Sequence, residues 1–203
     1  MANVAVIGAS GNVGTRLVKE LSDRGHEVTG IARHPEKVAD LPGVTSMAGD
    51  IAAPEALAQI LKGHDAVIST VMFASVDPEA LIGVVRASGV KRYLVVGGAG
   101  SLEVAPGMRV IDTPDFPAEY MTEAGAGCTF LERLRLADDL EWTFLSPSAV
   151  FFPGERTGTF RLGSDTLLAT DEGSSISYED FAIAMVDEIE TPAHVRSRFT
   201  VGY

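Results

Sequence analysis

The stretch Gly8-Ala9-Ser10-Gly11-Asn12-Val13-Gly14 interrupts the apolar run Asn3 to Ile7 and leads directly into an amphipathic segment. A strand that ends in glycines and opens into a helix gathers unpaired backbone N–H groups and the positive end of the helix dipole at one point. Gly8 permits the turn, Gly11 allows an anion to approach the backbone, and Gly14 lets the helix pack against the strand. We therefore interpret the stretch as a phosphate-binding loop. The alternative is a glycine turn that only connects packed elements.

Apolar runs alternate with amphipathic segments throughout the first hundred residues. The runs predict strands at 3–7, 27–32, 45–48, 66–70 and 93–96, and the segments between them predict helices at about 13–24, 54–61 and 78–88. Strands as continuously apolar as Val4-Ala5-Val6-Ile7 are typical of a sheet that is buried on both faces. The alternation predicts an α/β fold, a doubly wound parallel sheet of the Rossmann type with helices on both faces.

The second hundred residues are less regular. Gly97 to Pro117 contains four glycines and three prolines, too many for a core element, and we expect substrate-side insertions at about 98–118 and 147–175. The remaining elements expected are a helix over 118–139 interrupted at Gly125 and Gly127, a strand at 142–145, a hairpin over 159–168, a helix capped by Ser177 that runs to about 189, and a strand at 198–201. With 203 residues, of which 46% are hydrophobic, we expect a single domain over 1–203.

The net charge of −12 is unevenly distributed along the chain. Residues 1–100 hold 9 Lys and Arg against 10 Asp and Glu, whereas the remainder hold 7 against 18. A surface that binds nucleic acid would carry the opposite sign, so no nucleic-acid partner is expected. No apolar run is long enough to span a membrane, the N-terminus carries no signal peptide, and Cys128 is the only cysteine, so we expect a cytoplasmic protein. His194 has no companion ligand nearby, and no metal site is expected.

Polar residues follow several predicted strands, where ligands of open α/β sheets bind. Arg33, at the end of the second strand, suits the 2′-phosphate of NADP, since an acidic residue there would instead bind the ribose hydroxyl of NAD. The alternative for Arg33 is a solvated side chain. The dipeptide Asp50-Ile51 either contacts adenine through the Asp50 carboxylate or supplies a cap for the next helix. Ser69 and Thr70 are expected to line the cofactor path.

The fifth strand ends in Gly97-Gly98-Ala99-Gly100-Ser101. Small residues at this position leave room for a nicotinamide ring, so we assign Gly97, Gly98 and Ala99 to the cofactor. Ser101 is the candidate catalytic residue, because its hydroxyl can polarise a carbonyl of the substrate.

Together the glycine loop, Arg33, Val95-Val96-Gly97-Gly98-Ala99-Gly100 and Leu140-Glu141-Trp142-Thr143-Phe144-Leu145-Ser146-Pro147 resemble the atypical short-chain dehydrogenase/reductases. The most similar group is the NAD(P)H-binding proteins that are often called NADH-flavin reductases by similarity, which look like biliverdin reductase B and, more distantly, like NmrA-like proteins. The resemblance extends over nearly the whole chain and implies a Rossmann fold with a nicotinamide cofactor.

The chain departs from the dehydrogenases that act on alcohols, which use a Tyr four residues before a Lys. No tyrosine here has that companion, and no lysine occurs after Lys91. We therefore expect an NADPH-dependent reductase of a conjugated acceptor such as a flavin, quinone or tetrapyrrole, whose own π-system accepts the hydride. Candidate walls of the acceptor site are Phe73, Phe151, Phe152 and Arg156. The alternatives are an NADP-binding redox sensor without catalysis and a nucleotide-sugar epimerase or dehydratase.

Overall fold

The computed structural model describes residues 1–203, which form one α/β domain. Its centre is an eight-stranded sheet in the order β10-β12-β8-β5-β4-β1-β2-β3. Every neighbouring pair is parallel except β10 and β12. The strands span β1 Asn3–Ile7, β2 Glu27–Ala32, β3 Val44–Ala48, β4 Ala66–Ser69, β5 Arg92–Val96, β8 Glu141–Pro147, β10 Arg161–Gly163 and β12 Ser197–Gly202.

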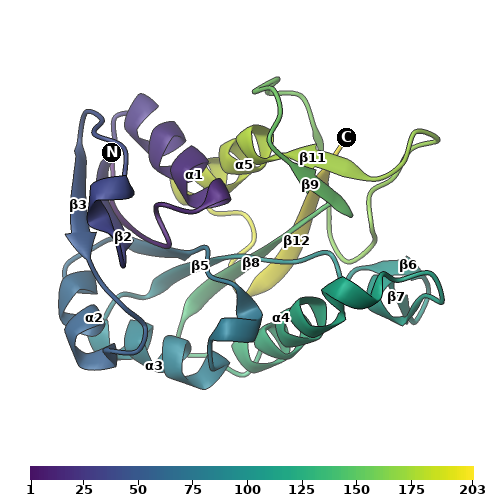
Figure 1. Ribbon diagram of the computed structural model, residues 1–203, viewed down its shortest axis with the longest axis horizontal. Coiled ribbons are helices and arrows are strands. Elements are labelled where there is room, and N and C mark those ends of the chain that lie inside the picture. The colour runs from purple at the N-terminus through teal and green to yellow at the C-terminus, as the bar shows by residue number, and fades with distance from the viewer.

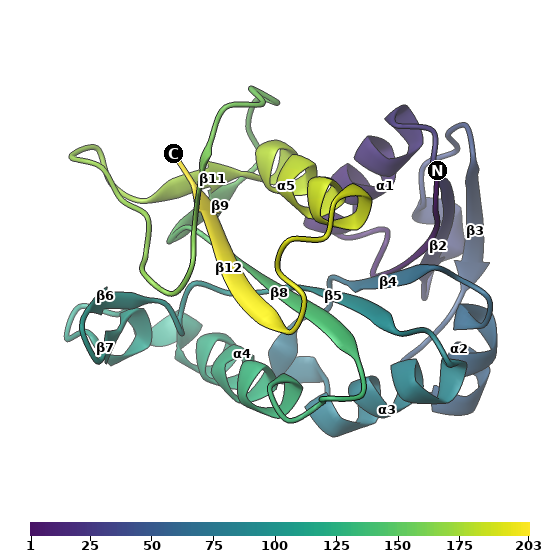
Figure 2. The same ribbon diagram turned by 180° about the vertical axis from the view of Figure 1, so that it is seen from behind.

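Helices cover both faces of the sheet (Figures 1 and 2). One face carries α1 (Asn12–Asp23) and α5 (Tyr178–Glu190), and the other carries α2 (Pro54–Leu61), α3 (Pro78–Ser88) and α4 (Met121–Leu134). Each layer has its own apolar core of 22 buried residues, which matches the continuously apolar central strands. The predicted doubly wound Rossmann-type sheet is confirmed.

The chain reverses its direction of travel across the sheet between β1 and β4. The first three strands lead to one edge, and β4 then returns to pair with the other side of β1. Such a reversal leaves a crevice at the carboxyl ends of the strands, where the connections to the two helical layers diverge. The glycine loop that follows β1 lies at this crevice, as does Thr70 at the end of β4.

The irregular segments hold short pieces of structure that the sequence did not indicate. Two small sheets pair β6 (Glu103–Ala105) with β7 (Met108–Arg109) and β9 (Val150–Phe152) with β11 (Ser175–Ser177). Four 3-10 turns complete the chain: η1 Pro35–Lys37, η2 Phe73–Ser75, η3 Val110–Asp112 and η4 Ala118–Tyr120.

Two expectations for this half are wrong. No hairpin forms over 159–168, since Arg161–Gly163 instead pairs antiparallel with β12, whose outer edge would otherwise be open. The helix α4 is not broken at Gly125 or Gly127. A Cβ at Gly127 would lie 3.0 Å from the Phe73 ring, so this glycine serves close packing within a continuous helix.

None of the helices combines the length and the apolar composition that a membrane-spanning segment requires.

Candidate functional site

The glycine loop forms a tight turn between β1 and α1. Gly8 has a φ of +86°, and the amides of Gly8 and Ala9 both donate to the carbonyl of Ile31 on β2. A Cβ at Gly14 would lie 2.1 Å from the carbonyl oxygen of Gly8, so only glycine allows the first turn of α1 to approach the loop this closely. The loop is therefore held in place by main-chain contacts on both sides.

The same loop leaves a set of donors without partners. The amides of Ser10, Asn12, Val13 and Gly14 donate to no protein atom, and the N-cap residue Gly11 supplies no capping side chain. A Cβ on Gly11 would meet only the Gly8 carbonyl, at 3.2 Å, so this position is open in front of the loop. Four free N–H groups, the positive end of a helix and an uncovered backbone fit a pyrophosphate.

Thr70 supports the loop from the neighbouring strand. Its hydroxyl donates to the carbonyls of Ile7 and Gly8, at 3.1 and 3.0 Å. Thr70 thus supports, from behind, the loop on which the expected cofactor path begins. Ser69 points away from that path, because its buried hydroxyl is hydrogen-bonded to the hydroxyl of Tyr93 at 2.9 Å.

The basic side chains that follow β2 form no ion pairs. Arg33 is exposed and pairs with no acidic side chain, and Lys37 on the following 3-10 turn is likewise unpaired. At the end of β3 the carboxylate of Asp50 accepts from the amide of Ala52, whereas the N-cap of α2 is Ala53. Asp50 therefore stabilises a turn before α2 and does not cap that helix. Ile51 packs partly buried against the core beneath.

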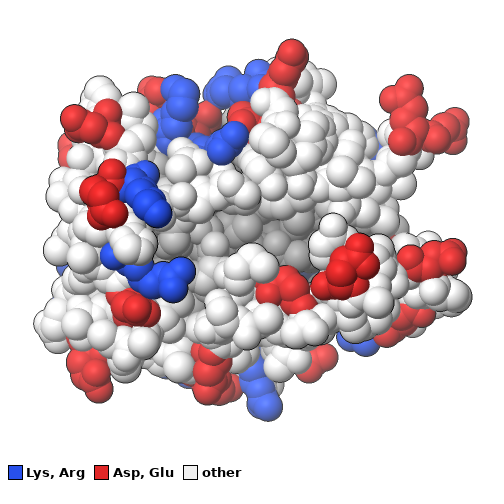
Figure 3. Space-filling model, in the orientation of Figure 1, with Lys and Arg blue, Asp and Glu red and all other residues white.

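Further along the same sheet edge lies a pocket of about 750 Å³. It opens at the carboxyl ends of β5 and β8, between α4 and the first residue of α5, and it is lined by Gly97, Gly98, Ala99, Gly100 and Ser101 among other residues. Figure 3 shows it as a central hollow of uncharged atoms, with Lys and Arg on its left and upper sides and Asp and Glu bordering its lower right. A Cβ at Gly97 would lie 2.3 Å from the Phe144 ring, so the floor is closely packed from below.

Ser101 lines the pocket, and Arg198 holds its hydroxyl in place. Its Oγ accepts from Nη1 of Arg198 at 3.3 Å, and Arg198 is in turn paired with Asp165. The arginine leaves the Ser101 hydroxyl proton free to donate toward the pocket. Cys128 also lines the pocket, but burial raises the pKa of its thiol, which disfavours a nucleophilic thiolate.

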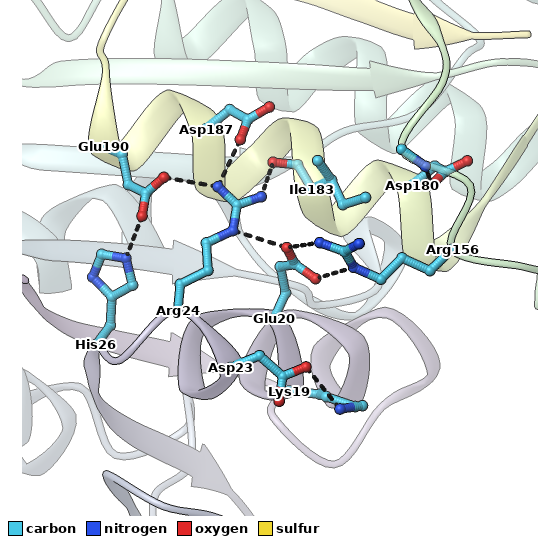
Figure 4. Close-up of polar contacts among 11 residues, drawn as sticks. Lys19, Glu20, Asp23, Arg24, His26, Arg156, Asp180, Ile183, Asp187 and Glu190 are labelled. Carbon is cyan, nitrogen blue, oxygen red and sulfur yellow. Dashed lines mark hydrogen bonds and ion pairs between the residues drawn. The ribbon is translucent and has the colours of Figure 1, made fainter.

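The four predicted walls separate into two groups. Phe73 and Phe151 line the pocket, Phe73 from the aromatic core and Phe151 in an edge-to-face pair with Tyr178 at 4.6 Å. Phe152 is not among the lining residues, and its ring lies against Gly154. Arg156 points toward α1, where it donates two hydrogen bonds of 2.8 Å to the Glu20 carboxylate (Figure 4).

Several lining residues carry no signal in the sequence. Tyr178 reaches the pocket from the N-terminus of α5, with the Arg16 guanidinium 5.7 Å from its ring centre. Tyr120 and Met72 reach it from irregular segments. The sequence pattern places Tyr178 only at the start of the helix that Ser177 caps, and this cap is confirmed, since the Asp180 amide donates to the Ser177 hydroxyl at 3.0 Å. Only the path of the backbone brings these side chains to the pocket.

Comparison with known proteins agrees with this geometry. A family model described as NAD(P)H-binding matches residues 8–192. The uncharacterised protein YwnB of Bacillus subtilis is 42% identical over 98% of this chain and 97% of its own length. A solved structure from Bacteroides thetaiotaomicron, named as a candidate epimerase, is 40% identical with a TM-score of 0.94 over 100% of this chain and 97% of that one.

A second solved structure, from Streptococcus pneumoniae, is named as a candidate NADH-flavin reductase. It is 35% identical, with a TM-score of 0.87 over 100% of this chain and 99% of that one. The matched region runs from the glycine loop to just past the end of α5, so it contains both the loop with the free amides and the pocket. The chain therefore belongs to the NAD(P)H-binding family, among the atypical short-chain dehydrogenase/reductases.

Proposed function

We propose that the protein is an NAD(P)H-dependent reductase that transfers a hydride to a flat, conjugated acceptor. One observation carries the proposal. The loop with four free amides and the pocket lined by aromatic side chains lie along the same edge of the sheet, and no lysine lines that pocket. When bound, the nicotinamide cofactor supplies a hydride, and a proton from water completes the two-electron reduction, for example of a quinone to a hydroquinone.

The chain's own residues bind and orient the two partners in this proposal. The amides of Ser10, Asn12, Val13 and Gly14 hold the pyrophosphate, and the small residues Gly97 to Ala99 leave space for the nicotinamide ring. Phe73, Phe151 and Tyr178 provide apolar faces for the acceptor, and the Ser101 hydroxyl donates to an acceptor carbonyl. Positioning of this kind lowers the barrier without a dedicated proton relay. We place the reaction in the cytoplasm, in keeping with the free thiol of Cys128.

The pocket disfavours the epimerase alternative. Tyr120 and Tyr178 both line it, but its 23 lining residues include no lysine to lower the pKa of a tyrosine hydroxyl. An acceptor that takes the hydride into its own π-system does not need that pair.

The test of activity is the oxidation of NADPH, followed by its absorbance, with flavins, quinones and biliverdin as acceptors. We expect turnover with at least one of these classes. Tight binding of NADPH without turnover of any acceptor would contradict a reductase and support the redox-sensing alternative.

We further propose that NADPH is preferred over NADH, because Arg33 is exposed and free of ion pairs at the ribose end of the site. The substitution Arg33→Asp should weaken NADPH binding about 10- to 100-fold and NADH binding far less, as expected for loss of a phosphate contact. Arg135→Asp is the matched control, since Arg135 is also exposed, forms no ion pair and caps the C-terminus of α4 outside the pocket. Equal losses for both cofactors would show that Arg33 does not contact a 2′-phosphate.

A further inference from the structure

The pocket contains no cationic side chain. None of its 23 lining residues is Lys, Arg or His, whereas Asp115 and Glu123 are both among them. The Glu123 carboxylate accepts from the amides of Phe73 and Ala74, at 2.7 and 2.9 Å. Asp115 is exposed and pairs with no cation. No neighbouring cation neutralises the negative charge of Asp115, so this charge acts on any ligand in the pocket.

Three arginines that contact a lining residue or directly precede one in the chain are already paired. Arg109 forms a two-pronged ion pair with Asp112, and Arg198 is bound to Asp165. Arg16 is held by Glu179 and lies over the ring of Tyr178, 5.7 Å from its centre. An anionic group on an acceptor would find no free cation here to replace its lost water, and it would face an unpaired carboxylate.

The two ends of the site thus differ in charge. The glycine loop and Arg33 offer free amides and a free guanidinium to a polyanionic cofactor, whereas the acceptor end offers aromatic faces and a carboxylate. Figure 3 shows the same division, with Asp and Glu along the lower right border of the hollow. The charge of the second half of the chain, 18 Asp and Glu against 7 Lys and Arg, strengthens this repulsion.

We propose that the acceptor is a neutral conjugated ring, such as a quinone or an unphosphorylated isoalloxazine, and that Asp115 selects against anionic acceptors. The inference rests on the proposed reductase function and narrows its substrate class. Apolar and aromatic walls bind a neutral flat ring through burial and stacking, which need no counter-ion. A carboxylate at the rim repels phosphate or sulfonate groups and so acts mainly on specificity.

Riboflavin and FMN provide a matched test, since they share one ring system and differ in a phosphate group. With NADPH as donor, kcat/KM should favour riboflavin about five- to tenfold at low salt, and the preference should shrink as ionic strength rises. Binding is measured separately, by quenching of flavin fluorescence in the absence of turnover. The neutral 1,4-naphthoquinone and its 2-sulfonate give a second pair with the same expected order.

The variant Asp115→Asn should raise kcat/KM for FMN and for the naphthoquinone sulfonate. The preference for the neutral compound should therefore become smaller in both pairs. Asp138→Asn is the control, because Asp138 is an equally exposed and unpaired carboxylate outside the pocket, and it should leave both preferences unchanged.

The outcomes separate this inference from the proposed function. Reduction of FMN as well as or better than riboflavin would overturn the charge selection and leave the reductase assignment standing. Binding of riboflavin in preference to FMN without any turnover would support the charge selection and overturn the reductase assignment. Failure of every neutral ring to bind would overturn the inference.

Discussion

At the residue scale, Gly11 and Gly14 have different reasons to be glycine. The missing side chain of Gly14 is required by the fold, since a Cβ there would meet the Gly8 carbonyl oxygen at 2.1 Å and its carbon at 2.9 Å. Gly11 has an ordinary extended backbone, with φ −77° and ψ 172°, which alanine also adopts. Its missing side chain matters for the space in front of the loop. Within one motif, Gly14 is therefore required by the fold, whereas Gly11 is the glycine that we expect to serve binding.

This difference predicts opposite behaviour for two alanine variants. Gly14→Ala should lower the free energy of unfolding by about 3 kcal/mol or more, because backbone must move to relieve the overlap. Gly11→Ala should cost only about 1 kcal/mol but weaken NADPH binding about tenfold or more, because its methyl group occupies the approach to the amides. Urea denaturation and cofactor titration measure the two effects.

The control for both variants is Gly83→Ala. Gly83 lies in α3 and a Cβ there would meet nothing within 4 Å, so the change should stabilise the protein by about 0.5 to 1 kcal/mol. Comparable loss of cofactor binding in the Gly11 and Gly83 variants would contradict a binding role for Gly11.

At the scale of elements, a charged network joins α1, α5 and the segment after β9. The buried carboxylate of Glu20 binds Arg156 and Arg24, and Arg24 also reaches Asp187 and Glu190 on α5 (Figure 4). The hydrogen bonds from Arg156 are the largest influence on Glu20, and together with Arg24 they outweigh burial and lower the pKa of its carboxyl. The network fixes one helical layer and holds Arg156 away from the pocket.

The lowered pKa predicts how acid affects this layer. Because folding favours the ionised form of Glu20, its contribution is present above the unfolded pKa of about 4.3 and disappears as pH falls through the lower folded pKa. Glu20→Gln should destabilise the protein by about 1 to 2 kcal/mol at pH 7, a value reduced by the exposure of Arg156. The stability difference between wild type and variant should then diminish between about pH 5 and pH 3.

Thermal unfolding of both proteins across this range measures the difference directly. Glu179→Gln is a useful companion, since the Gly154 amide and Arg16 outweigh burial and lower the pKa of that carboxyl too, at the other end of the same layer. A gap between wild type and Glu20→Gln that stays constant with pH would show that Glu20 contributes by packing and not by charge.

At the scale of the whole molecule, the sequence predicted local structure well and distant contacts poorly. The central strands, the helices of the first half and the glycine loop follow from periodicity and from residues a few positions apart, and all are confirmed. The partner of β10 depends on which sheet edge is open, and the need for glycine at position 127 inside α4 depends on the Phe73 ring that packs beside it. Neither feature can be predicted from residues that are close together in the sequence.

The candidate site shows the same limit. Gly97 to Ser101 and Phe73 lie where a strand end and the following turn place them, and sequence reasoning could identify them. The sequence predicts Arg156 as a wall of the acceptor site as well. Its side chain binds Glu20 instead, which is 136 residues away in the chain. Tyr178 and Asp115 reach the pocket only because α5 and the turns before α4 border it in three dimensions. A single sequence contains no signal for such contacts.

The hydroxyl of Thr70 supports a loop that lies 62 residues earlier in the chain. We therefore expect the binding shape of the loop to depend on β4 as well as on the glycine motif. During folding, β1, α1 and β2 can form from contacts that are close in sequence, whereas the support from the Thr70 hydroxyl is added only when β4 pairs with β1. A nascent chain that ends before β4 would carry every glycine of the motif and still lack the support from Thr70. We therefore expect cofactor binding to strengthen when the two halves of the sheet have joined.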